Sequence, residues 1–206
     1  LAGLTILVAE DDPVNQLVLR DYLRDAGATV VLAANGRAAV DQVIEARPAA
    51  ILVAGDLFHS VRPTNHSILF AFQQFHRLRE ALPDAPLVLL AGNHDTPRST
   101  ETGSILGLFE SLGADVVADE PRRLAWPRLD LSVLAVPHMA LITGERPVLR
   151  PEGGERHQVL MLHGEVEGIF PADRSSAEYG GALLARDELA RGGWGYVALG
   201  HYHVQR

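Results

Sequence analysis

The sequence predicts an α/β fold in which helices flank a parallel sheet. Three apolar runs, at residues 4–9, 51–54 and 87–91, show no polar alternation, which is typical of parallel strands covered on both faces. Amphipathic helical patterns at 14–26 and 65–82 stand between them. Strands that alternate with helices through short connections indicate right-handed β-α-β units.

The first quarter of the chain reads as strand, helix, strand and helix. Asp12 suits an N-cap and Pro13 the first turn of the first helix, while Gly27 suits its end. We expect these elements in turn: a strand at 4–9, a helix at 14–26, a strand at 29–33 and a helix at 37–46.

The remaining chain has longer connections. We expect a strand at 51–54, a helix at 65–82, a strand at 87–91, a helix at 99–112, strands at 115–118 and 131–136, a loop at 137–155, a strand at 158–162, a loop at 165–181, a helix at 182–190 and a strand at 195–199. The first five strands should form one parallel sheet with the second strand at its edge. The region from about 122 onward should add a second sheet against it, and residues 1–206 should form a single α/β domain.

Composition and net charge limit which metal ligands, membrane segments and nucleic-acid contacts this chain can have. Zero Cys excludes disulfides and thiolate metal sites, so any metal here has nitrogen and oxygen ligands, and it favours a cytoplasmic protein. No apolar run reaches the roughly 18 residues of a membrane span, and the N-terminus lacks the basic segment of a signal peptide. The net charge of -8 opposes non-specific binding to nucleic acid. The chain starts at Leu1 without an initiator Met, which is consistent with a processed or excised segment.

Metal-binding residue types follow several of the buried strands. In open α/β sheets the ligand crevice lies beyond the carboxyl ends of the strands, so side chains at those ends meet. The residues that we expect there are Asp56, Asn93, His94 and Asp95, with His163, His201 and His203 at the ends of later strands.

Four sequence blocks carry a family resemblance. They are Gly55-Asp56, Gly92-Asn93-His94-Asp95, His163-Gly164 and Gly200-His201-Tyr202-His203. In this order and spacing, from about residue 50 onward, they resemble the signature of calcineurin-like metallophosphoesterases. Two segments are most similar to the nuclease subunit of bacterial DNA-repair exonucleases. They are Gly-Asp-Leu-Phe-His-Ser, which starts at Gly55, and Asp95-Thr-Pro-Arg, which ends the second block and continues beyond it.

This resemblance implies a fold, an activity and partners. The fold is a metallophosphoesterase-like sandwich of two sheets, of which this segment is truncated at its C-terminus. The activity is hydrolysis of phosphodiester bonds, with DNA as a candidate substrate, by two divalent ions about 3.5–4 Å apart. Mn²⁺ is the expected ion, with Mg²⁺, Fe and Zn²⁺ as alternatives. An ATPase subunit or a second copy of the chain is the implied partner, and no membrane is involved.

The resemblance also implies residue roles. Asp56 would bridge the two ions, Asn93, His163 and His201 would complete one site, and His203 would belong to the other. His94 would contact the phosphate and protonate the leaving oxygen, and Asp95 would orient His94 or its neighbours. His138 has no motif of its own, so we expect a surface or loop position for it.

One family motif is absent. The first strand of the family ends in Asp-x-His, whereas the first strand here is followed by Glu10-Asp11-Asp12. Glu10 and Asp12 keep the i, i+2 spacing and could bind the first ion through carboxylates alone, favouring Mg²⁺ or Mn²⁺. The alternatives are an empty first site, or a pocket of acidic residues that lacks a catalytic partner.

Residues at about 4–48 carry a different resemblance. The runs Ile6-Leu7-Val8-Ala9-Glu10-Asp11-Asp12-Pro13-Val14-Asn15 and Ala34-Asn35-Gly36-Arg37-Ala38-Ala39 resemble a response-regulator receiver, which implies a flavodoxin-like sheet order. The receiver's phosphoacceptor, hydroxyl and lysine positions fall on Ala54, Ala91 and near Glu120, and none can do that chemistry. The chain therefore looks like a chimera with a junction near 47–51. A receiver-like signalling or binding module and a catalytically inert chimera are the alternatives to an enzyme.

Overall fold

The computed structural model describes residues 5–9, 13–25, 27–96, 103–143, 147–168 and 182–201. They fall into two compact units, one made of segments within 1–50 and 66–85 and the other of segments within 51–65 and 86–203. No helix within the described ranges is long and apolar enough to cross a membrane.

The first unit holds one short sheet and three helices. Strand β1 (Thr5–Ala9) pairs in parallel with β2 (Thr29–Ala33), and α1 (Pro13–Asp25) connects them. Helix α2 (Gly36–Ala46) is capped by the Asn35 side chain, which accepts a hydrogen bond of 2.9 Å from the Ala38 N–H. An ion pair of 2.8 Å between Arg77 and Asp41 joins α3 (Asn65–Ala81) to α2.

A three-stranded parallel sheet begins the second unit. Its order is β3 (Ile51–Val53), β4 (Leu87–Leu90) and β5 (Asp115–Val117), and every residue of the central strand is buried. One parallel sheet of five strands was the expectation from the sequence; the structure instead forms β1–β2 and β3–β4–β5 as separate sheets.

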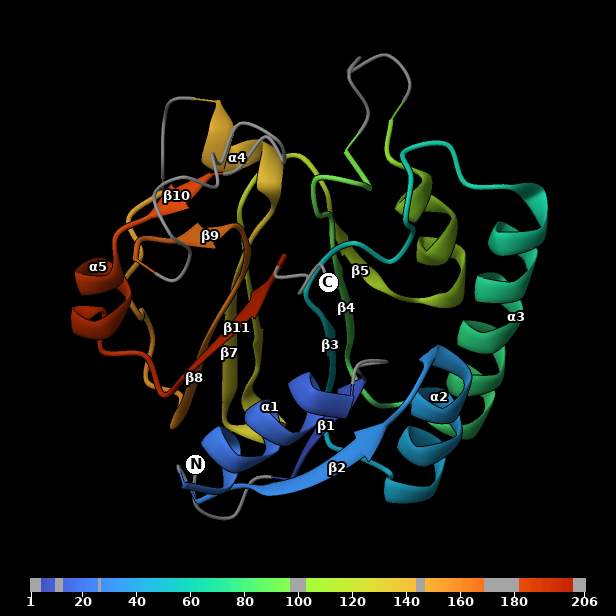
Figure 1. Ribbon diagram of the computed structural model, residues 1–206, viewed down its shortest axis with the longest axis horizontal. Helices are drawn as coiled ribbons and strands as arrows, with labels where there is room; N and C mark the ends of the chain where they lie inside the picture. The colour runs from blue at the N-terminus through green and yellow to red at the C-terminus, as the bar shows by residue number, and fades with distance from the viewer. Residues whose placement is uncertain are drawn as a thin grey trace. The chain divides into compact units, whose positions relative to one another are not determined.

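A four-stranded sheet also belongs to the second unit, in the order β11 (Tyr196–Gly200), β8 (His157–His163), β7 (Leu131–Val136) and β6 (Arg122–Trp126). Figure 1 labels its strands β11, β8 and β7. Strands β11, β8 and β7 are parallel, and β6 is antiparallel to β7. The two sheets share an apolar core in which Val88 and Leu90 of β4 pack with Val133 of β7 and Met161 of β8. Leu134 and Val136 of β7 and Leu160 and Leu162 of β8 belong to a second apolar cluster, so these two central strands are covered on both faces.

Three segments differ from the sequence prediction. The helix expected at 99–112 is a 3₁₀-helix over Ile105–Leu112. Gly103, with a positive φ of 63°, precedes it, and the Ser104 side chain caps its first turn by accepting a hydrogen bond from the Leu106 N–H. Residues 97–102 lie outside the described ranges. The expected loop at 137–155 contains helix α4 (His138–Ile142), whose Ala140 and Leu141 join the core.

The third difference lies near the C-terminus. The helix expected over 182–190 is shorter, α5 (Arg186–Arg191), and strand β10 (Leu183–Leu184) precedes it. Strand β10 pairs in parallel with β9 (Glu165–Val166), which the sequence had indicated as loop. Leu184 is fully buried, so core packing outweighs the helical pattern here.

Candidate metal centre

Four strands of the second unit deliver polar side chains to one place. Asp56 follows β3, Asn93 follows β4, His163 ends β8 and His201 follows β11. One ligand atom from each of Asp56, His163 and His201 lies within 4.8 Å of the others. The cluster could therefore hold a metal ion.

The distances centre on the side-chain oxygen of Asn93. Its Oδ1 is 3.0 Å from His163 Nε2 and 3.0 Å from His201 Nδ1. His163 Nε2 is also 3.2 Å from Asp56 Oδ2 and 3.3 Å from His201 Nδ1. A carboxylate oxygen, an amide oxygen and two imidazole nitrogens thus face one another.

Glycines next to these residues make the close approach feasible. A Cβ at Gly92 would lie 2.6 Å from the Asp56 backbone nitrogen and 2.7 Å from His163 Cε1. A Cβ at Gly55 or Gly200 would also collide with this cluster, and Gly55 adopts a positive φ of 95°. Gly55, Gly92 and Gly200 therefore leave room beside the cluster that a side chain would fill.

Each of the two imidazoles has one ring nitrogen that faces the cluster and one that faces away. The contacts of the outward nitrogens indicate that the nitrogens facing the cluster carry no hydrogen. His163 Nδ1 lies 2.9 Å from the Ala54 carbonyl oxygen, which can only accept, so Nδ1 carries the hydrogen. His201 Nε2 lies 3.3 Å from Oε1 of Glu165, a carboxylate that accepts in the same way. When both rings are neutral, His163 Nε2 and His201 Nδ1 therefore present lone pairs to Asn93 Oδ1 and Asp56.

Charge at the cluster is set by burial and by these contacts. Burial by itself would raise the pKa of Asp56, but its contacts with His163 and the His94 backbone N–H outweigh burial and hold the pKa below its ordinary value. Burial, followed by the charge of His163, lowers the pKa of His201 although Glu165 opposes the shift. A carboxylate, an amide oxygen and two imidazole nitrogens form a donor set that divalent cations bind, and binding of a cation requires the neutral form of each imidazole.

Asp95 and His94 border the cluster. The Asp95 carboxylate is 1% exposed and accepts hydrogen bonds from the backbone N–H groups of Leu57 (3.2 Å), Phe58 (3.3 Å) and Gly92 (3.1 Å), so it ties together the loops after β3 and β4. The His94 backbone N–H donates to Asp56 Oδ1 at 3.0 Å, and its Nδ1 hydrogen-bonds the His59 carbonyl oxygen.

Comparison with known proteins agrees with this arrangement. The family model of the calcineurin-like phosphoesterases matches residues 32–205. This chain belongs to that family. The match begins in β2, earlier than the boundary near residue 50 that the motifs indicated. Residues 32–50 carry none of the four signature blocks, so the motifs alone could not place the boundary.

Relatives of the family are similar to this chain at low identity. The DNA double-strand break repair protein Mre11 of Sulfurisphaera tokodaii is 26% identical over 175 residues, which cover 81% of this chain and 41% of that protein. The uncharacterized metallophosphoesterase YhaO of Bacillus subtilis is 28% identical over 181 residues, covering 84% and 41%. The chain thus spans about two fifths of the length of these curated relatives.

Among solved structures, the chemotaxis protein CheY4 of Vibrio cholerae matches 56% of this chain and 84% of its own, at 22% identity and a TM-score of 0.34. That score is too low to assign a fold to any part of the chain.

The sequence did not predict the burial of two polar residues near the metal cluster, His138 and Glu165. His138 was expected at a surface or loop position, yet it begins helix α4, is 4% exposed, and forms a T-shaped pair with the His163 ring at a centroid distance of 6.3 Å. Burial, followed by the charges of His163 and His201, lowers the pKa of His138 to about 4. Glu165 was read as loop and is 9% exposed beside His201. The only available signal was its place directly after His163-Gly164.

Three residues that the sequence indicated as metal ligands lie outside the described residues, one from the family resemblance and two that stand in place of its missing Asp-x-His motif. They are Glu10, Asp12 and His203.

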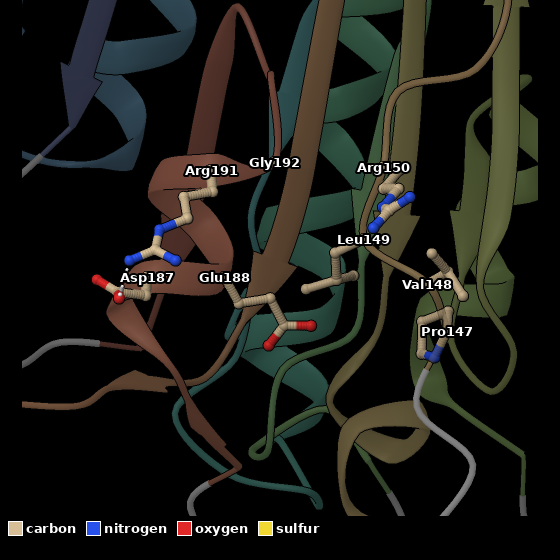
Figure 2. Close-up of a pocket in the computed structure, with 8 residues that line it drawn as sticks. All are labelled: Pro147, Val148, Leu149, Arg150, Asp187, Glu188, Arg191 and Gly192. Atoms are coloured by element: carbon tan, nitrogen blue, oxygen red, sulfur yellow. Dashed lines mark hydrogen bonds and ion pairs between the residues drawn. The ribbon is translucent and has the colours of Figure 1, made fainter.

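A separate cleft of about 510 Å³ lies beside α5 and contains none of the cluster residues. Figure 2 shows its charged rim, where Arg191 and Asp187 form an exposed ion pair of 2.7 Å. Its lining consists of Pro147, Val148, Leu149, Arg150, Asp187, Glu188, Arg191 and Gly192.

Proposed function

We propose that this chain hydrolyses phosphodiester bonds in a metal-dependent reaction, with Mn²⁺ as the preferred ion. One observation carries the proposal: four electron-pair donors, on Asp56, Asn93, His163 and His201, face one another while the imidazole N–H groups point outward to other acceptors. With neutral rings, no hydrogen stands between those donors, and a cation would relieve their mutual repulsion. Family membership supports the same chemistry.

In this proposal, four side chains of the cluster bind metal and His94 transfers a proton. Asp56, Asn93, His163 and His201 would hold one divalent ion, and Asp56 would bridge to a second. Bound divalent ions would supply an activated water and charge stabilisation at the phosphoryl group. His94 would transfer the proton to the leaving oxygen. Since its Nδ1 is hydrogen-bonded to the His59 carbonyl, Nε2 is the atom that exchanges this proton.

DNA is the finer part of the proposal. The printed name of the Mre11 relative refers to repair of DNA double-strand breaks, which motivates DNA as the substrate class. The net charge of -8 works against non-specific DNA binding, so we expect a small activated phosphodiester to be hydrolysed more readily than DNA. An ATPase subunit or a second copy as partner stays a prediction.

The test uses the whole chain, stripped of metal with EDTA and supplied with increasing Mn²⁺. Bis-(4-nitrophenyl) phosphate and single- and double-stranded DNA serve as substrates. Asp56→Ala should lose both Mn²⁺ binding and hydrolysis. His94→Ala should keep Mn²⁺ binding but lose roughly 10²–10⁴-fold in rate, the usual contribution of proton transfer.

The matched control is His76→Ala, because the His76 side chain lies on the exposed side of α3 and forms an ion pair with the exposed Glu80. It should behave like the parent chain. A parent that is no faster than Asp56→Ala at saturating Mn²⁺ would leave the inert chimera as the better description.

A further inference from the structure

Glu165 is a buried carboxylate that belongs to none of the four signature blocks. Its side chain is 11% exposed and the side chain of His201 is 5% exposed, so water screens their contact poorly. Glu165 Oε1 lies 3.3 Å from His201 Nε2, on the side of the ring away from the cluster.

The backbone holds this carboxylate in place. The Glu165 N–H donates to the Ala182 carbonyl at 2.9 Å, and Glu165 pairs with Leu183 in the β9–β10 ladder. A Cβ at Gly164 would lie 2.9 Å from the same Ala182 oxygen, so a larger residue there would push the two segments apart. The position of Glu165 therefore follows from strand pairing and not from its contact with His201.

His201 needs an outside partner more than His163 does. His201 has a φ of 112°, a region that non-glycine residues rarely adopt and that persists only where contacts from the surrounding structure hold the residue in place. The Nδ1 of His163 is oriented by a neutral backbone carbonyl at 2.9 Å. Glu165 instead offers a charged acceptor, which favours a hydrogen on His201 Nε2 and concentrates electron density on Nδ1.

We infer that Glu165 is a positioning residue: it selects the His201 tautomer that carries the hydrogen on Nε2 and turns the bare Nδ1 toward the metal cluster. This rests on the proposed function, because it assumes that the cluster binds a divalent ion. Glu165 itself touches neither the ion nor the substrate. Its loss should weaken metal binding while the cluster residues remain present.

The experiment compares Glu165→Leu, Glu165→Gln and the control Glu167→Leu in the whole chain. Glu167 is the same residue type two positions along, with an exposed side chain. Mn²⁺ affinity is measured by electron paramagnetic resonance after EDTA treatment, and urea unfolding in EDTA checks the fold. The tautomer of His201 is measured by ¹⁵N NMR of the imidazole nitrogens in the metal-free chain.

Glu165→Leu should bind Mn²⁺ roughly 10–100-fold more weakly, the usual cost of losing a partner of a metal-ligating His. Glu165→Gln should fall between Leu and the parent, because its amide oxygen accepts the same hydrogen bond without the charge. Glu167→Leu should match the parent. In the parent His201 should carry its hydrogen on Nε2, and in Glu165→Leu the two tautomers should mix.

Two results would overturn the inference. One is unchanged Mn²⁺ affinity in folded Glu165→Leu, or in Glu165→Gln if the Leu variant fails to fold. The other is a parent in which His201 carries its hydrogen on Nδ1. Failure of the proposed function would give another result. The parent would then bind Mn²⁺ no better than Asp56→Ala does, and substitutions of Glu165 would not change the affinity.

Discussion

Replacing Gly92 by Ala should disrupt the cluster without removing any ligand. The new Cβ would lie 2.6 Å from the Asp56 backbone nitrogen and 2.7 Å from His163 Cε1, whereas ordinary contact starts at 3.4 Å. Both neighbours would have to retreat by several tenths of an ångström. Metal ligands tolerate about ±0.2 Å, so the site cannot absorb this movement and keep its geometry.

The magnitude follows from the same distances. Inserting a methyl group into a packed site costs about 1–3 kcal/mol of unfolding free energy. We expect Mn²⁺ affinity to fall by at least roughly 10-fold. This is the lower end of the loss in affinity that follows when residues supporting metal ligands are changed. Unfolding free energy is read from urea titrations in EDTA, and affinity from calorimetric titration with Mn²⁺.

Gly107→Ala is the matched control. A Cβ at Gly107 meets nothing within 4 Å, and its φ is not positive. This change should leave Mn²⁺ affinity unaltered and shift stability by no more than about 1 kcal/mol, in the stabilising direction. If the Gly92 and Gly107 variants were indistinguishable in both measurements, the argument that Gly92 supplies room for the cluster would be wrong.

Other outcomes can be checked on the same chain. Asp95→Asn should lower the unfolding free energy by about 1–3 kcal/mol in urea titrations, because an amide cannot accept all three backbone hydrogen bonds that the buried carboxylate accepts; a stability equal to the parent would contradict this. Burial raises the pKa of Tyr196, so above pH 10 the unfolded chain releases a proton that the folded chain keeps. Unfolding free energy should therefore fall as pH rises beyond 10, and less steeply in Tyr196→Phe; parallel pH profiles would refute it. Acetyl phosphate should not phosphorylate the chain, since Ala54 stands where a receiver has its acceptor; mass spectrometry showing a stable acyl-phosphate on Asp56 would count against this.

Local pattern was sufficient for most of the strands and helices. The uninterrupted apolar run of β4 predicted a strand covered on both faces, and all of its residues are buried. Pattern failed where neighbours decided the outcome. Residues 138–142 form a helix that joins the core, and Leu183 and Leu184 pair with β9 although their surroundings read as helical. A single sequence contains no information on which partner strand will be available.

The sequence by itself determined the identity of the clustered side chains. Asp56, Asn93, His163 and His201 were expected at strand ends because parallel strands present their carboxyl ends along one edge. That rule depends only on chain direction, so it can be applied before any coordinates are known.

Tertiary structure alone decided how those side chains are held. The Ala54 carbonyl that orients His163 is 109 positions away in sequence, and Glu165 is 36 positions from His201. The ring of His138 meets that of His163 within the same buried region. No motif spacing predicts such contacts, because they arise from packing one sheet on another, and packing sets which lone pairs face the cluster and which hydrogens point away.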